Sequence, residues 1–408
     1  MALATTLRTS IPYVLVALSA SSLPVFAYDW VPNPQPKGNW FTGWQDLPDI
    51  PGAQLIDDWP VPGTDSSMYQ SSGLDPSQVT RAIIAPGAKL RDHWNYWNDM
   101  QNVKMDLAST DTSFDPNTTS VISPCFLAEI DINAGAGGAN TLYWDTNGWF
   151  NGHYAQGPDV NDQVSSFDVF DSLVDYYFNE TMYPKMENLL FVGHSAAAQF
   201  VHRYAAMRTP TRHDDKIGWI IGNPASYLWL VEDRPVEVSD CDNIDDYKFG
   251  LSGNMPGYST GNFNDVGRSG IVSRYLGRYI HYALGTADLG SGDNSCQALT
   301  QGSSHFERGQ NYIAMLEAMP DGMPKTQTLD LIEGVSRQDV QMFNSTQLRQ
   351  RIFKLDVNDT RSLDTSSSGG NARVKRDILG QVQENGASTS SRGIFLAITS
   401  IALHNLLL

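Results

Sequence analysis

The chain has 408 residues, of which 41% are hydrophobic and 18% charged, and its formal net charge is −18. This apolar content is enough for one large core, or at most two domains. A surface this acidic repels the phosphates of nucleic acids and anionic lipids, so we expect no nucleic-acid partner.

Residues 1–27 have the pattern of a secretory signal peptide. Arg8 supplies a positive charge, residues 11–20 form a largely apolar run, and residues 25–27 (Val-Phe-Ala) resemble a cleavage site. The apolar run is too short to span a bilayer comfortably. We therefore expect a secreted protein whose mature chain begins at Tyr28.

Residues 385–408 have the pattern of a GPI-attachment signal. Small residues at 385–387 are followed by a polar spacer at 388–392 and a terminal apolar tail at 393–408. The tail would be removed and Asn385 would carry the lipid, which predicts a chain held on the outer membrane leaflet. An ordinary tail anchor is the alternative.

Glycosylation sequons and cysteines agree with an extracellular protein. Three cysteines are too few for a disulfide framework, and we expect Cys241 to pair with Cys296 while Cys125 is buried, although the sequence does not fix this pairing. Four Asn-x-Ser/Thr sequons are present, at Asn117, Asn179, Asn344 and Asn358.

Between the two terminal signals the composition changes three times. Residues 28–75 are rich in Trp, Pro and Gly, which predicts an irregular N-terminal arm. Residues 76–345 are predicted to form the main domain, with a Gly-, Asn- and Asp-rich insertion at about 224–270 that we interpret as a cap. Residues 346–384 are polar and are predicted to be a flexible linker.

Short apolar runs alternate with helical periodicity along the main domain. Such alternation predicts an α/β fold with a mostly parallel central sheet and helices on both faces. The predicted strands cover residues 80–85, 121–132, 188–193, 217–221, 279–285 and 326–333, and the predicted helices cover residues 90–105, 165–178 and 196–207.

A possible serine nucleophile follows the third of these strands, in the sequence Gly193-His194-Ser195-Ala196-Ala197. A tight turn between a strand and a helix pushes a serine oxygen out of the sheet edge, and small residues are needed two positions before and after it. The amide of Ala196, at the start of the helix, is placed to donate to an oxyanion. The alternative is an ordinary serine in a turn.

Together with other segments, this turn resembles the α/β-hydrolase superfamily, and most closely its secreted fungal members of largely unassigned substrate. The resemblance covers residues 81–343. It is carried by residues 84–87 (IAPG), 91–92 (RD), 95–97 (NYW), 191–197 (FVGHSAA), 199–201 (QFV), 223–227 (NPASY), 284–288 (LGTAD), 301–302 (QG) and 307–309 (ERG).

The resemblance implies an α/β-hydrolase fold with an inserted cap, and it implies roles for single residues. Ser195 would be the nucleophile, and Asp288 would orient the base. The backbone of Gly87 or Ala88 would supply the second oxyanion donor. Neither a cofactor nor a metal is implied. The alternative for Asp288 is a turn residue that caps the next helix.

The base that should activate the serine is missing from its usual place. In this superfamily a histidine follows the last core strand, but here Arg337 stands there. Arginine stays protonated, with a pKa above about 12, and cannot accept a proton. His305, in the helical stretch after Asp288, is the alternative base, whereas His404 lies in the tail that we expect to be removed.

Two hypotheses follow. The first is a cell-surface serine hydrolase that acts on an ester or related acyl bond of a small-molecule or lipid-like substrate. The second is a catalytically impaired α/β-hydrolase-fold protein that binds a ligand at the cell surface, which Arg337 favours. For His93, His153 and His194 we expect structural or surface roles.

Overall fold

The computed structural model describes residues 28–61, 64–158 and 163–363. The predicted signal peptide, residues 1–27, and the predicted lipid-attachment signal, residues 385–408, lie outside the described residues. Within the described part of the chain, no helix is both long and apolar enough to cross a bilayer.

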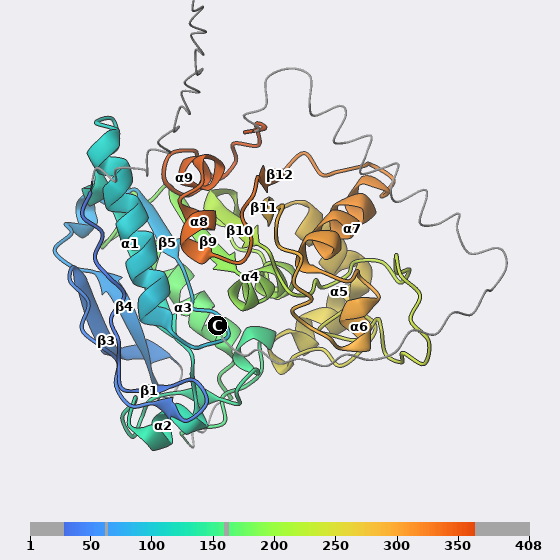
Figure 1. Ribbon diagram of the computed structural model, residues 1–408, viewed down its shortest axis with the longest axis horizontal. Helices are drawn as coiled ribbons and strands as arrows, with labels where there is room; N and C mark the ends of the chain where they lie inside the picture. The colour runs from blue at the N-terminus through green and yellow to red at the C-terminus, as the bar shows by residue number, and fades with distance from the viewer. Residues whose placement is uncertain (1–27, 62–63, 159–162, 364–408) are drawn as a thin grey trace, which may run out of the picture.

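A twisted sheet of eight strands forms the centre of the described chain, in the order β12-β11-β10-β9-β5-β6-β4-β3 (Figure 1). The six strands β12, β11, β10, β9, β5 and β6 are parallel to one another, whereas β4 runs antiparallel to β6 and β3 antiparallel to β4. The carboxyl ends of the parallel strands therefore meet at one edge. The bounds are β3 Ala53–Val61, β4 Thr64–Ser71, β5 Arg81–Ile84, β6 Thr119–Cys125, β9 Asn188–His194, β10 Ile217–Gly222, β11 Tyr279–Gly285 and β12 Gln327–Ile332.

Helices cover both faces of the sheet, as predicted (Figure 1). One face carries α1 (His93–Thr110), α8 (Asp339–Phe343) and α9 (Thr346–Phe353). The other carries α3 (Ser166–Tyr177), α4 (Ala196–Met207), α5 (Gly257–Leu276) and α7 (His305–Glu317). Smaller elements surround this frame: β1 Gly38–Asn39, β2 Gly43–Trp44, β7 Leu127–Ala128, β8 Tyr143–Trp144, α2 Glu129–Ala134 and α6 Cys296–Leu299.

The core lies between the central strands and the helices on the α4 face. Strands β9 and β10 are buried along their whole length, which explains their unbroken apolar sequences. Aromatic rings continue the core outward: Phe191 of β9 stacks on Trp219 of β10 at 4.8 Å, and Phe170 of α3 contacts Phe200 of α4 at 4.4 Å. Ser165 caps α3 by accepting a hydrogen bond from the Phe167 amide (3.1 Å).

The prediction of an irregular arm over residues 28–75 is wrong, because this segment contains β3 and β4, which extend the main sheet. Strand β4 has the polar sequence TDSSMYQS, yet Ser66, Ser67 and Gln70 are buried. Gln70 donates to the Tyr177 hydroxyl (3.2 Å). Side-chain hydrogen bonding thus allows a polar strand inside the fold, and such a strand has no apolar signature.

The boundary predicted at residue 346 is also wrong. Thr346–Phe353 forms α9, and Arg351 within it is fully buried, with its guanidinium bound to both carboxylate oxygens of Asp330 (2.9 and 3.2 Å). This pair fastens α9 to β12. The remainder of the predicted linker, residues 364–384, lies outside the described residues.

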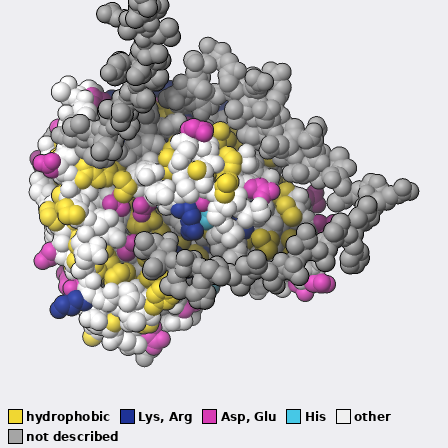
Figure 2. Space-filling view, viewed as in Figure 1, with side chains coloured by type: hydrophobic (Ala, Val, Ile, Leu, Met, Phe, Trp, Pro, Cys, Tyr) yellow, Lys and Arg dark blue, Asp and Glu magenta, His cyan; other side chains and the backbone are white. Residues whose placement is uncertain are grey.

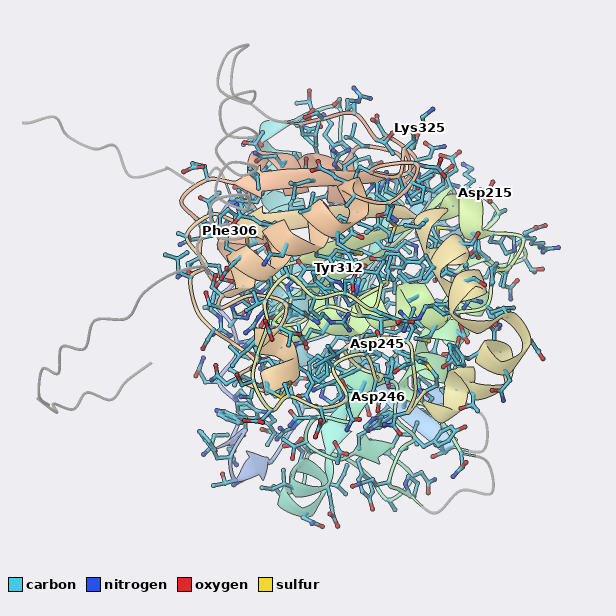
Figure 3. All side chains as sticks on the ribbon, turned by 90° about the vertical axis from the view of Figure 1, so that its right-hand side faces the viewer. Asp215, Asp245, Asp246, Phe306, Tyr312 and Lys325 are labelled. Carbon is cyan, nitrogen blue, oxygen red and sulfur yellow. A yellow bond between two sulfur atoms is a disulfide. The ribbon has the colours of Figure 1, made fainter. Side chains whose placement is uncertain are left out.

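The predicted cap is shorter than expected. Its irregular part covers residues 223–256, and the residues from Gly257 onward belong to α5, which is interrupted at Gly267 (φ +63°). The glycines of α5 hid this helix in the sequence. Tyr227 of the cap stacks on Tyr312 of α7 at 4.4 Å, so the cap packs against that helix. Figure 3 labels Tyr312.

A disulfide joins Cys241 of the cap to Cys296 of α6, and Cys125 is buried with a free thiol. The predicted sequons lie at the surface to different degrees. Asn117, Asn179 and Asn358 are exposed, whereas Asn344 is half-buried and its side-chain oxygen accepts a hydrogen bond from Arg349 (3.0 Å).

Asp92, directly before α1, and Asp99, within α1, are buried close to Asp339 at the start of α8. Removal from water, with the nearby charge of Asp339, raises the pKa of Asp92 to about 6 and that of Asp99 to about 8. The folded chain therefore holds protons that the unfolded chain releases near pH ~4. This stabilisation is complete below that pH and is lost as the pH rises through 6 and 8.

We expect the melting temperature to fall between pH 5 and pH 9, and Asp99→Asn to reduce this fall. The substitution removes the buried charge but keeps an oxygen that can accept the hydrogen bond from Asn33 (3.1 Å). The variant should be more stable than the parent at pH 9 by at least about 1.4 kcal/mol, the equivalent of one pKa unit. Circular dichroism melts across this range measure the effect, with the exposed Asp57→Asn on β3 as control. Equal slopes for parent and Asp99→Asn would contradict the prediction.

Candidate active site

The turn between β9 and α4 has the geometry of a nucleophile elbow. Ser195 has φ +58° and ψ −120°, a conformation that side chains rarely adopt, and its amide donates to the Gly222 carbonyl oxygen (2.9 Å). A Cβ atom on Gly193 would overlap the backbone of Ala197, which is why glycine is required there. Ala197 is itself fully buried, so the methyl group in place of a second glycine is accommodated.

The predicted oxyanion loop lies between β5 and α1. The Gly87 amide donates to His93 Nδ1 (3.0 Å), and His93 Nε2 lies 3.2 Å from the Phe126 carbonyl oxygen. Burial lowers the pKa of His93 to about 4, so the ring is neutral at pH 7. His93 therefore has a positioning role, and it occupies the Gly87 amide. Of the two second donors predicted from the sequence, this leaves Ala88.

A buried ion pair anchors the same loop. Arg91, with φ +58°, binds both carboxylate oxygens of Asp131 through Nε (2.5 Å) and Nη2 (2.9 Å), and both side chains are fully buried. Asp131 also accepts a hydrogen bond from the Trp44 amide (3.0 Å). The loop is thereby tied to the β1–β2 hairpin and to α2.

The predicted acid and the alternative base form a hydrogen-bonded pair. Asp288 follows β11, His305 begins α7, and His305 Nδ1 lies 3.2 Å from Asp288 Oδ1. Both side chains are essentially inaccessible to solvent, with exposed fractions of 0% and 1%. Asp288 caps neither of the next two helices, because Ser295 accepts the hydrogen bond from the Ala298 amide in α6 and Ser304 that from the Glu307 amide in α7.

The second nitrogen of His305 faces the wall of the hollow that contains Ser195. Nε2 is buried without a hydrogen-bond partner among the described residues. A Cβ atom on Gly292 (φ +59°) would overlap Nε2 and would lie 3.0 Å from Cβ of Ala225, and both Gly292 and Ala225 line the hollow. The segment 290–294 therefore separates His305 from the hollow, and the described structure contains no hydrogen bond between Ser195 and a histidine.

The hollow around Ser195 has a volume of about 570 Å³. Arg337 reaches it from the loop after β12, so the residue at the usual place of the base lines the same hollow as the nucleophile. Its lining residues come from the elbow, the oxyanion loop, the cap, the segment after Asp288 and the loop after β12: Lys89, Asn147, Phe150, Ser195, Ala196, Gln199, Ala225, Lys248, Gly290, Ser291, Gly292, Asp293, Asn294 and Arg337.

The other histidines singled out from the sequence do not line this hollow. His194 is buried, with its ring 6.2 Å from that of Phe343, and burial lowers its pKa to about 4. His153 is exposed and lies 3.9 Å from Asp145. Sequence reasoning missed Lys89 and Lys248 as lining residues. In the part of the chain that the structure describes, no cluster of three or more His, Cys, Asp or Glu side chains could hold a metal ion.

Similar solved structures identify the fold of this chain. The sequence matches no protein-family model and no curated protein. The structure is similar to LpqC, a poly(3-hydroxybutyrate) depolymerase from Bordetella parapertussis, with a TM-score of 0.50, 18% identity, and coverage of 80% of this chain and 93% of that chain. It is also similar to poly(aspartic acid) hydrolase-1 from Sphingomonas sp. KT-1, with a TM-score of 0.50, 16% identity, and coverage of 74% and 97%. The chain therefore has the α/β-hydrolase fold, as the sequence predicted.

Proposed function

We propose that the protein is a serine hydrolase that cleaves an ester or a related acyl bond, with Ser195 as nucleophile and His305 as its base. The observation that carries this proposal is the buried Asp288–His305 pair, whose free Nε2 faces the wall of the hollow around Ser195. The chain order of nucleophile, acid and histidine typical of the fold is kept, with the histidine on a helix directly after the acid.

The reaction would proceed through an acyl-enzyme. Ser195 Oγ attacks the carbonyl carbon while His305 Nε2 accepts the hydroxyl proton, which it then gives to the leaving group. Water repeats these steps to release the acid. Asp288 holds the Nδ1–H of His305 and stabilises the imidazolium. Because the segment 290–294 covers Nε2, this segment has to shift when substrate binds.

Charge on the tetrahedral oxygen would be stabilised by two backbone amides. Ala196 opens α4, so its N–H has no acceptor inside the helix and points along the favourable end of the helix dipole. Ala88 supplies the second donor, because the Gly87 amide is occupied by His93. Arg91 and Asp131 keep that loop in place.

The second hypothesis, a silent binding protein, rested on Arg337. The buried Asp288–His305 pair weakens this hypothesis, because the chain has an acid and a base in contact although position 337 is not a histidine. The two similar structures are named as a depolymerase and a hydrolase, which also supports the enzymatic reading. A small acyl group fits a hollow of about 570 Å³.

A fluorophosphonate probe should label the purified protein covalently. The probe reacts with a serine only when a base and oxyanion donors activate it, so labelling reports the assembled site. In-gel fluorescence and peptide mass spectrometry should place the label on Ser195, and Ser195→Ala should abolish it. Absence of labelling at high probe concentration would rule out the proposed function.

His305→Gln should lower kcat for a short-chain ester by about 10⁴-fold, because the proton of Ser195 then has no acceptor. Arg337→His should not raise kcat, since the base is already present. Steady-state kinetics test both variants, with His213→Gln as a matched control, because His213 is half-buried just before β10, at the amino end of that strand. An increase of activity in Arg337→His together with unchanged activity in His305→Gln would reverse the assignment.

We further propose that the enzyme acts at the cell surface, on the outer leaflet of the membrane, attached through a lipid at Asn385. This proposal rests on the sequence patterns of residues 1–27 and 385–408 alone. In cells of the native host, phosphatidylinositol-specific phospholipase C should release the protein into the medium, whereas Asn385→Leu should prevent surface attachment. Retention of the protein on cells after this treatment would argue for a tail anchor.

A further inference from the structure

The hollow around Ser195 is cationic, although the chain as a whole is strongly acidic. Lys89, Lys248 and Arg337 line it, against the single carboxylate of Asp293, while the net charge of the chain is −18. These cations come from the oxyanion loop, the cap and the loop after β12, so distant parts of the sequence converge there. On the face shown in Figure 2, acidic side chains are scattered, while one of the few basic groups lies near the middle.

A fourth cation lies behind the wall of the hollow. Arg203 of α4 is fully buried and donates hydrogen bonds only to neutral acceptors: the Phe150 carbonyl oxygen (3.0 Å), Asn151 Oδ1 (2.8 Å), Gln199 Oε1 (2.9 Å) and Ser226 Oγ (3.3 Å). None of the described carboxylates forms an ion pair with it. The carboxylate of Asp293 attracts Arg203 without forming an ion pair with it, and this attraction does not offset the burial of the guanidinium. Phe150 and Gln199, which accept its hydrogen bonds, are also lining residues. Arg203 therefore contributes to the positive electrostatic potential inside the hollow.

The lining cations are also incompletely neutralised. Lys248 Nζ lies 4.0 Å from Asp293 Oδ2, the outer limit of an ion pair, and Asp293 Oδ1 already accepts two hydrogen bonds from Ser295. Arg337 has no ion pair or hydrogen bond among the described residues. Lys89 lies over the Trp40 ring at 5.5 Å. Burial, and then repulsion from Arg203, lowers the pKa of Lys248 to about 8, because the attraction of Asp293 does not offset these two effects.

We propose that this hollow selects acyl substrates that carry a carboxylate near the scissile bond. The inference rests on the proposed function and names its substrate class. A carboxylate in the hollow would bind Lys248 and Arg337 directly and would add to the single negative charge, that of Asp293, which now faces these cations and Arg203. The neutral remainder of the acyl group would lie against Phe150 and Ala225.

The test compares two methyl esters of equal chain length, methyl hydrogen glutarate and methyl pentanoate, by titration of the acid released at pH 7. We expect kcat/KM to be at least about tenfold higher for the anionic ester, and the preference to shrink between 50 and 500 mM salt because ions screen exposed charges. Lys248→Gln and Arg337→Gln should each reduce the preference about three- to tenfold. Equal kcat/KM for the two esters, or a preference unchanged in both variants, would overturn the proposal.

Lys325→Gln is the matched control. It also removes one lysine charge, but Lys325 precedes the amino end of β12, at the edge of the molecule (Figure 3), whereas Ser195 follows the carboxyl end of the parallel strand β9. The preference should stay as in the parent protein. An equal loss in this control would mean that only net charge matters, and the proposal would then be wrong.

Glutarate binding to Ser195→Ala, measured by calorimetry, separates this inference from the proposed function because it needs no catalysis. Binding that is weakened by Lys248→Gln in the same background, without hydrolysis of either ester by the parent protein, would support the carboxylate site and refute the hydrolase. Hydrolysis of both esters at equal rates without glutarate binding would support the hydrolase and refute the carboxylate site.

Discussion

A carboxylate that is removed from water needs a hydrogen-bond donor, and at Asp288 that donor is the imidazole of His305. The pairing determines much of what surrounds the site. Strand β11 delivers the acid to the carboxyl edge of the sheet, α7 begins at the base, and the chain between them forms a wall of the hollow beside Ser195. The loop after β12 is then free to carry Arg337 instead of a histidine.

Parts of the fold that are buried on both faces could be predicted from the sequence because burial leaves an apolar run. Strands β9, β10 and β11 and helix α4 follow this rule. Strand β4 does not, since its sequence is polar although it is buried and Gln70 bonds to the Tyr177 hydroxyl, and α5 does not, since its glycines resemble a loop. Helix α9 is held by the ion pair between Arg351 and Asp330, which no periodicity reveals.

The residues of the candidate site also differ in whether the sequence could predict them. Ser195 was predicted because a steric rule fixes the small residues around it, and Asp288 because the segment 284–288 resembles the α/β-hydrolase superfamily. His305 could be named only as an alternative, since its distance from Asp288 depends on how the chain folds between them. The cationic lining could not be predicted, because Lys248 lies in a cap without periodicity and Arg203 looks like an ordinary residue of an amphipathic helix.

The disulfide between Cys241 and Cys296 ties these parts together, because Cys296 lies between the acid and the base and Cys241 lies in the cap that carries Lys248. A cross-link across a separation of 55 residues removes about 4 kcal/mol of chain entropy from the unfolded state. A reducing compartment would therefore lower the stability of the folded chain. Because Tyr227 of the cap and Tyr312 of α7 belong to the same buried core as the strands that present Ser195, this loss would weaken the nucleophile and its activating groups together.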